Sequence, residues 1–114
     1  MTVTEITQIG KAAINDENLF VLFGETVTPD LLDVSIVQKK ISQEPIDLKV
    51  GGKISFGAQD YQVVGVGPLV NQTLNEIGHA TVFFQKEVGG IPNAIYVVPE
   101  QLPKLEVGME IRFQ

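Results

Sequence analysis

The residue best suited to chemistry in this sequence is its single histidine, His79. An imidazole combines a pKa near ~6.5 with a nucleophilic nitrogen, so it can carry a proton or a phosphoryl group near neutral pH. His79 also follows a segment expected to be helical, where its ring can donate to free carbonyls and its cation favours the negative end of the helix dipole. The residues alone leave a catalytic and a structural interpretation of His79 open.

The other charged pairs are weaker candidates. Asp30 and Asp33 lie three residues apart after Pro29 and could form a carboxylate pair for acid–base chemistry. The same segment is more typical of a helical turn with two solvated acids. Lys39 and Lys40 are typical of an exposed strand edge, which lysine protects against aggregation.

Composition excludes several classes of site and partner. The 114 residues include no cysteine, so disulfides, thiolate catalysis and cysteine-based metal sites are excluded, and one histidine cannot build a multi-histidine metal site. We therefore expect no metal and no cofactor. Eight basic residues are scattered among fourteen acids, and the net charge of −6 argues against nucleic-acid binding.

Hydropathy indicates a protein that is not embedded in a membrane. The longest apolar runs are about five residues, against the ~20 that a membrane helix needs. The first ten residues also lack the blocks of a secretory signal. We expect a cytoplasmic protein, and the sequence leaves a homo-oligomer open.

Short segments rich in β-branched and aromatic residues alternate with turn signals along most of the chain. This pattern predicts an all-β fold in one domain, residues 1–114, built as a small closed or partly closed barrel of about 7–8 short strands. The candidate strands are residues 3–9, 19–23, 34–41, 53–56, 61–66, 80–84, 94–98 and 110–113.

One short helix is predicted at about residues 69–78. Val70, Leu74 and Ile77 recur at the i, i+4 and i+7 positions that share one helix face. Asn71 is a candidate N-cap, and Gly78 is a stop signal. His79 would then lie just past the C-terminus of the helix.

A nine-residue pattern, L-x-V-G-x-x-I-x-F, occurs at residues 48–56 and again at 105–113. It is explained either by an ancient duplication or by the needs of a glycine turn that feeds an alternating strand. We favour the second explanation, because the similarity ends with these nine positions.

Two adjoining stretches, residues 56–67 and 73–84, resemble the glucitol/sorbitol-specific IIA components of the bacterial phosphotransferase system. In that family a G-x-x-x-Y-x-V-x-x-V-G segment leads through a short helix into N-L-x-E-L-G-H and a strand. This chain has the same order and spacing, from Gly57 to His79. The similarity continues through residues 6–10, 22–23, 29–31 and 107–113, so it covers nearly the whole chain.

The resemblance implies a cytosolic carrier that accepts a phosphoryl group from HPr and passes it to the IIB unit of a sugar-alcohol permease. The implied partners are HPr and the IIB and IIC domains of that permease. A phosphohistidine suits this role, because its P–N bond keeps a high transfer potential and the ring nitrogen is both nucleophile and leaving group.

The chain departs from the family at the proposed phosphoacceptor. Counting forward from Asp30 places the family's histidine at Gln38, whereas counting backward from Gly57 places it at Lys39, because this chain has one extra residue between the two anchors. No histidine occurs from residue 34 to residue 57. Glutamine offers hydrogen bonds but no nucleophile.

Three functions follow as hypotheses. The first is a working IIA carrier with His79 as the acceptor. The second is a degenerate IIA-like module that binds a partner or regulator without being phosphorylated, because Gln38 replaces the family's acceptor. The third is a small-ligand or sugar-alcohol binding barrel that shares only the scaffold. Sugar specificity and the partner surface are not determined by the sequence.

Overall fold

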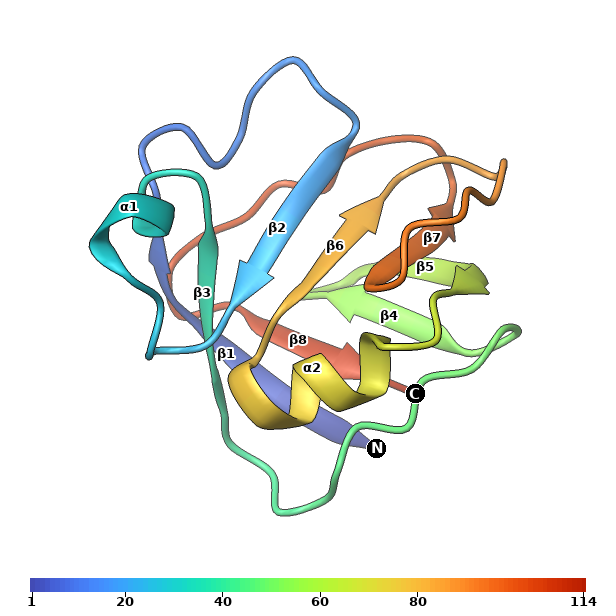
Figure 1. Ribbon diagram of the computed structural model, residues 1–114, viewed down its shortest axis with the longest axis horizontal. Coiled ribbons are helices and arrows are strands. Elements are labelled where there is room, and N and C mark those ends of the chain that lie inside the picture. The colour runs from blue at the N-terminus through green and yellow to red at the C-terminus, as the bar shows by residue number, and fades with distance from the viewer.

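In the computed structural model, which describes residues 1–114, eight strands close into a barrel and two short helices lie outside it (Figure 1). The strand order around the barrel is β1-β3-β2-β6-β7-β5-β4-β8. The strands are β1 Thr2–Ile9, β2 Leu19–Phe23, β3 Ile36–Lys40, β4 Lys53–Phe56, β5 Gln59–Val66, β6 Ala80–Phe83, β7 Ala94–Val98 and β8 Glu110–Phe113, and the helices are α1 Pro29–Leu32 and α2 Val70–Ile77.

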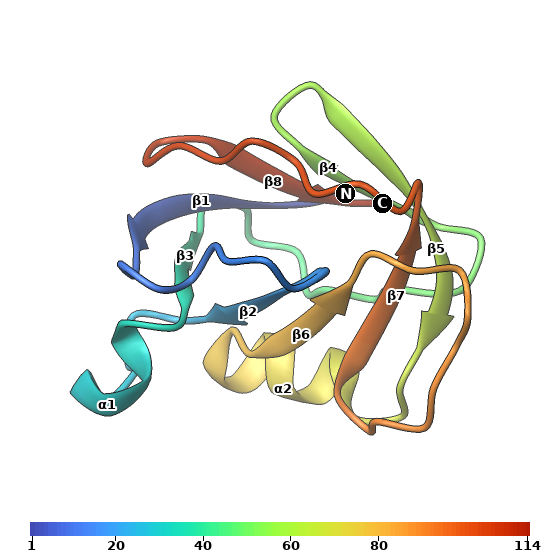
Figure 2. The ribbon, with the colours of Figure 1, turned by 90° about the horizontal axis from the view of Figure 1, so that it is seen from above.

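The sheet is mixed. β2 pairs in parallel with β3, and β6 pairs in parallel with β7, whereas the other neighbours are antiparallel. The barrel closes because β1 pairs with β3 on one side and with β8 on the other. Figure 2 shows α2 lying alongside β6, with α1 apart from it at the margin of the molecule.

The predicted all-β barrel is confirmed, and four of the eight predicted strands have the observed bounds. The others differ by one or two residues at one or both ends. The predicted fold counted one helix, whereas the helical turn favoured for the segment after Pro29 is observed as α1, a single turn with no buried residue. Neither helix has the length and apolar character that a membrane-spanning segment requires.

Aromatic side chains fill the middle of the barrel. Phe20, Phe56, Tyr61 and Phe84 are buried and pack with ring centroids 5.1 to 6.3 Å apart, mostly edge to face. This arrangement brings the positive edge of one ring to the negative face of the next. The cluster joins β2, β4, β5 and the end of β6 into one core.

The two copies of the nine-residue pattern pair with each other. Their strand portions are β4 and β8, which run antiparallel with Ile54 opposite Phe113 and Phe56 opposite Ile111. The turn glycines of the two copies, Gly51 and Gly108, have φ +92° and +93°, and a side-chain carbon added at either would meet no atom within 4 Å. Backbone conformation, rather than space, therefore explains the glycine in both copies.

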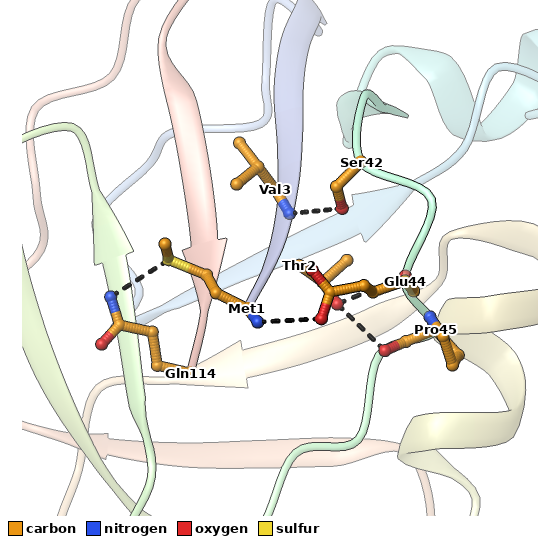
Figure 3. A network of polar contacts seen from close by, with 7 residues as sticks. All are labelled: Met1, Thr2, Val3, Ser42, Glu44, Pro45 and Gln114. Carbon is orange, nitrogen blue, oxygen red and sulfur yellow. Dashed lines mark hydrogen bonds and ion pairs between the residues drawn. The ribbon is translucent and has the colours of Figure 1, made fainter.

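The segment of residues 41–52 is fastened to the start of β1 (Figure 3). Ser42 Oγ accepts from the Val3 amide at 2.9 Å, and the Thr2 hydroxyl donates to the Pro45 carbonyl at 3.0 Å. The terminal ammonium of Met1 lies 3.2 Å from the Glu44 carboxylate. These contacts hold the segment where it can cross the barrel beside α2.

Truncating Phe20 tests the aromatic core. Phe20→Ala removes a fully buried ring that contacts two other rings. We expect the free energy of unfolding, measured by urea denaturation, to fall by about 3–5 kcal/mol. Val50→Ala is the control, because the Val50 side chain is largely exposed and its loss should change stability by less than about 0.5 kcal/mol. Equal effects of the two substitutions would contradict this description of the core.

Candidate functional site

The end of α2 places His79 at the start of β6. Gly78 ends the helix in the left-handed conformation, with φ +68°, and its amide donates to the Leu74 carbonyl at 3.0 Å. The predicted stop at Gly78 and the place of His79 just beyond the helix are both confirmed. The chain thus reverses into β6 through one residue that tolerates a positive φ.

Two glycines, Gly24 and Gly78, allow the junction between α2 and β6 (residues 77–79) to lie against the end of β2. The Gly24 amide donates to the Ile77 carbonyl at 2.8 Å. A side-chain carbon on Gly78 would lie 2.7 Å from the Gly24 nitrogen, and one on Gly24 would lie 2.7 Å from the Ile77 carbonyl oxygen. The backbones are therefore closer than any side chain at either position would permit.

Thr73 holds the backbone of His79 at both of its polar groups. The His79 amide donates to the Thr73 carbonyl at 3.1 Å, and the Thr73 hydroxyl donates to the His79 carbonyl at 2.6 Å. Because both groups are bonded to Thr73, six residues earlier on α2, the position of His79 follows the position of the helix.

The ring of His79 is fixed by β2. Its Nδ1 lies 3.0 Å from the Leu22 carbonyl oxygen, and its plane packs on the Phe23 ring with centroids 4.5 Å apart. A carbonyl oxygen can only accept, so Nδ1 must carry the hydrogen. In the neutral ring the free lone pair is therefore on Nε2.

The Nε2 atom of His79 reaches solvent. It has no hydrogen-bond partner in the protein, although the residue is half-buried. No buried side-chain nitrogen or oxygen of the chain lacks a partner, so Nε2 is not enclosed. The site therefore presents one oriented ring nitrogen with a free lone pair that is not fully buried.

The His79 ring does not bond to the carbonyls at the end of α2, as its structural interpretation predicts. Nδ1 of the ring donates instead to the carbonyl oxygen of Leu22 in β2. The reason is the pairing of β2 with β6, which sets Leu22 opposite Ala80 and so brings the residue before β6 beside the end of β2.

Gln38 lies against this junction. Its side chain is 3% exposed, its Oε1 accepts from the Thr4 hydroxyl at 2.8 Å, and its Nε2 donates to the Gly78 carbonyl at 2.9 Å. Lys39 is the position reached by counting backward from Gly57. Its side chain is exposed and makes no hydrogen bond or ion pair. Of the two positions, only Gln38 bonds to the residue that precedes His79.

Two asparagines, which the sequence interpretation missed as a pair, fasten α2 to the segment of residues 41–52. Asn75 accepts from the Ile46 amide and donates to the Ile46 carbonyl, both at 2.8 Å. Asn71 makes the same pair of bonds to Leu48, at 2.7 and 3.0 Å. Four residues of helix and two of extended chain advance by similar lengths, roughly 6 and 6.6 Å, which lets both pairs form.

The predicted N-cap role of Asn71 is therefore wrong. The helix begins after Leu69, with no side-chain cap, and the Asn71 amide is engaged by Leu48 instead. A local capping pattern could not reveal this partner, which lies 23 residues away in the sequence. The i, i+4 spacing of the two asparagines was the available signal.

A cavity of about 210 Å³ opens beside the junction, between the end of β3, the turn after β2 and the last turns of α2. Thr4, Gln38 and Gly78 line it, whereas His79 does not. The charged residues that line the cavity are two lysines and two glutamates, so their side chains give it no net charge. They are Glu25, Lys39, Lys40 and Glu76.

The carboxylates singled out in the sequence lie on the surface. Asp30 and Asp33 are exposed, and Asp33 pairs with Lys11 at 3.5 Å, which agrees with the interpretation as solvated acids. No group of three histidine, aspartate or glutamate side chains is arranged to hold a metal ion.

The two shifted pKa values belong to β5 and have structural causes. The hydrogen bond from Ser55, followed by the Lys53 ammonium, holds the pKa of the exposed Asp60 carboxyl below its usual value. Burial raises the pKa of Tyr61, whose hydroxyl donates to the Gln101 carbonyl at 2.7 Å. Neither group contacts the His79 junction.

Comparison with known proteins agrees with this geometry. Residues 1–112 match the family described as the PTS system glucitol/sorbitol-specific IIA component. The crystal structure of a PTS system IIA component from Enterococcus faecalis V583 superposes with a TM-score of 0.92 at 33% identity, covering 97% of this chain and 98% of that chain. No curated protein matches the chain.

The chain belongs to the glucitol/sorbitol-specific IIA family of the bacterial phosphotransferase system. Family membership and the structural match support a role as a phosphotransfer carrier, and they imply partners within that system.

Replacing Gly78 tests how the junction is built. Gly78→Ala would force a side chain into a left-handed conformation and within 2.7 Å of the Gly24 nitrogen. We expect a loss of about 1–3 kcal/mol in the free energy of unfolding. Gly90→Ala is the matched control, since its added carbon would meet nothing within 4 Å. An unchanged stability of Gly78→Ala would show that the junction does not need glycine.

Proposed function

We propose that the protein is a cytoplasmic phosphoryl carrier, a single IIA domain over residues 1–114, that accepts a phosphoryl group from HPr on Nε2 of His79. It would pass the group to the IIB domain of a sugar-alcohol permease of the glucitol/sorbitol type. The observation that carries this proposal is the bond from Nδ1 to the Leu22 carbonyl, which leaves the lone pair on Nε2, an atom that is not fully buried.

In the proposed step, the Nε2 lone pair attacks the phosphorus of the phosphohistidine on HPr. The new P–N bond forms as the bond to the donor nitrogen breaks, and the donor ring leaves with that electron pair. The His79 ring gains positive charge during the attack, and the Leu22 carbonyl, which faces the Nδ1 hydrogen, stabilises that charge. The same sequence in reverse transfers the group to the acceptor in IIB.

The helix end affects the stability of the phosphorylated form. The negative end of the α2 dipole lies at Gly78, next to His79, where it disfavours a bound anion. The dipole would therefore favour transfer of a phosphoryl group onward and would disfavour its acceptance by the same free energy.

A second candidate function is a degenerate IIA-like module that binds a partner without being phosphorylated. Gln38 supports it, because this buried amide occupies the position that the family resemblance gives to the acceptor and has no nucleophilic atom. Under this alternative His79 serves only as a link between β2 and β6.

Replacing the histidine separates the two functions. We expect wild-type protein, incubated with phosphoenolpyruvate, the first enzyme of the system and HPr, to gain one acid-labile phosphoryl group by mass spectrometry under alkaline conditions. His79→Asn should abolish it, because asparagine can keep a donor to the Leu22 carbonyl but lacks Nε2. His79→Gln should abolish it too, because no second imidazole can replace the ring.

Unfolding curves of His79→Asn control for folding, since its stability should remain closer to the wild type than that of His79→Ala. Phosphorylation that survives both substitutions, or a phosphoryl group on the peptide of residues 34–42, would refute the assignment. Wild-type protein that takes no phosphoryl group would favour the degenerate module.

Restoring the family's histidine tests that second candidate. If wild-type protein is inert, Gln38→His should gain an acid-labile phosphoryl group, because the scaffold would still dock HPr around the family's position. Lys39→His is the matched control for the alternative register. Gain in Lys39→His alone would show that Gln38 is not the equivalent position.

A further inference from the structure

Gln38 lies just beyond the end of β2, where no strand separates β3 from the chain that leads into β6. β2 lies between β3 and β6, and its paired residues end with Phe23 opposite Val37. Gln38 is the next residue of β3, so it stands beyond the last pair. Its side chain crosses from β3 to Gly78, the residue that leads through His79 into β6.

The bonds of Gln38 form a directed chain. The Thr4 hydroxyl donates to Oε1, and Nε2 donates to the Gly78 carbonyl. Thr4 lies in β1 and Gln38 in β3, and these two strands are antiparallel neighbours. Thr4 is opposite Lys40 and Ile6 is opposite Gln38, so the Thr4–Gln38 bond runs diagonally between the strands. All donors point the same way, so each bond polarises the next in this buried setting.

The chain of bonds acts on the peptide that carries His79. The carbonyl of the Gly78–His79 peptide accepts from Gln38, and the amide of the same peptide donates to the Thr73 carbonyl. With both polar ends bonded, this peptide cannot rotate without breaking one of them. Its orientation fixes the Cα of His79, and hence whether Nδ1 meets the Leu22 carbonyl.

We infer that Gln38 is a positioning residue for His79, whose amide holds the Gly78–His79 peptide so that Nε2 stays oriented for phosphoryl transfer. This inference rests on the proposed function. The chemistry of the amide suits the role, because it supplies one acceptor for Thr4 and one donor for Gly78, with no charge to bury. The glutamine that cannot accept a phosphoryl group itself thereby supports the histidine that can.

The test removes the hydrogen bonds of Gln38 to Thr4 and Gly78 with side chains of similar size. Gln38→Met has a similar length but no amide, and Thr4→Val keeps the branched shape but has no hydroxyl. Thr4→Ser restores the hydroxyl, so it should rescue what Thr4→Val loses. Gln62→Met is the matched control, because Gln62 is an exposed glutamine of β5 with no side-chain hydrogen bond.

The first measurement is nitrogen NMR of the His79 ring, which reports the tautomer without any phosphoryl donor. We expect a single Nδ1-protonated tautomer in wild-type, Thr4→Ser and Gln62→Met protein, and a mixture of tautomers in Gln38→Met and Thr4→Val. An unchanged tautomer in folded Gln38→Met and Thr4→Val would overturn the inference. If Gln38→Met fails to fold, Thr4→Val with its rescue by serine still decides the question.

The second measurement is the single-turnover rate of transfer from phosphorylated HPr. We expect a loss of about tenfold or more in Gln38→Met and Thr4→Val, because small displacements of a reacting group cost one to two orders of magnitude. A normal rate in both variants would overturn the inference. If wild-type protein takes no phosphoryl group, the proposed function fails, and the tautomer measurement still decides whether Gln38 positions the ring.

Discussion

The hydrogen bond between Nδ1 of His79 and the Leu22 carbonyl is the interaction on which the site depends. It sets the tautomer of the only imidazole in the chain, and it is available because β2 and β6 are neighbours in the barrel. The stacking of the ring on Phe23 and the close approach of Gly24 to Gly78 follow from the same neighbourhood. A change that separates β2 from β6 would alter all of them together.

Polar side chains as well as apolar ones position the helix that precedes this histidine. Only Val70 and Leu74 of α2 are buried in the core, which is little apolar anchorage for an eight-residue helix. The paired bonds of Asn71 and Asn75 to the segment beside the helix supply the rest. Each of these amides both donates to and accepts from the backbone, so a shift of the helix along the segment would break two hydrogen bonds at each asparagine.

Local sequence pattern predicts the barrel, the exact bounds of four of its eight strands, and Gly78 followed by His79 at the end of a helix. It does not predict the partners of side chains that bond over long separations. Capping is a local rule, so it assigns Asn71 to the helix start, yet the partner of Asn71 is 23 residues away. The sequence marks Gln38 as a missing nucleophile, whereas its bonds to Thr4 and Gly78 form only when three distant segments meet.

Locating the phosphoryl group on the ring is the most direct test of Nε2 of His79 as the acceptor. Protein labelled with nitrogen-15 in histidine and incubated with phosphorylated HPr should show one phosphorus resonance coupled to Nε2 of His79, with the hydrogen still on Nδ1. Coupling to Nδ1 would contradict the orientation set by the Leu22 carbonyl. A phosphorus resonance with no coupling to a ring nitrogen, or no phosphorus at all, would contradict His79 as the acceptor.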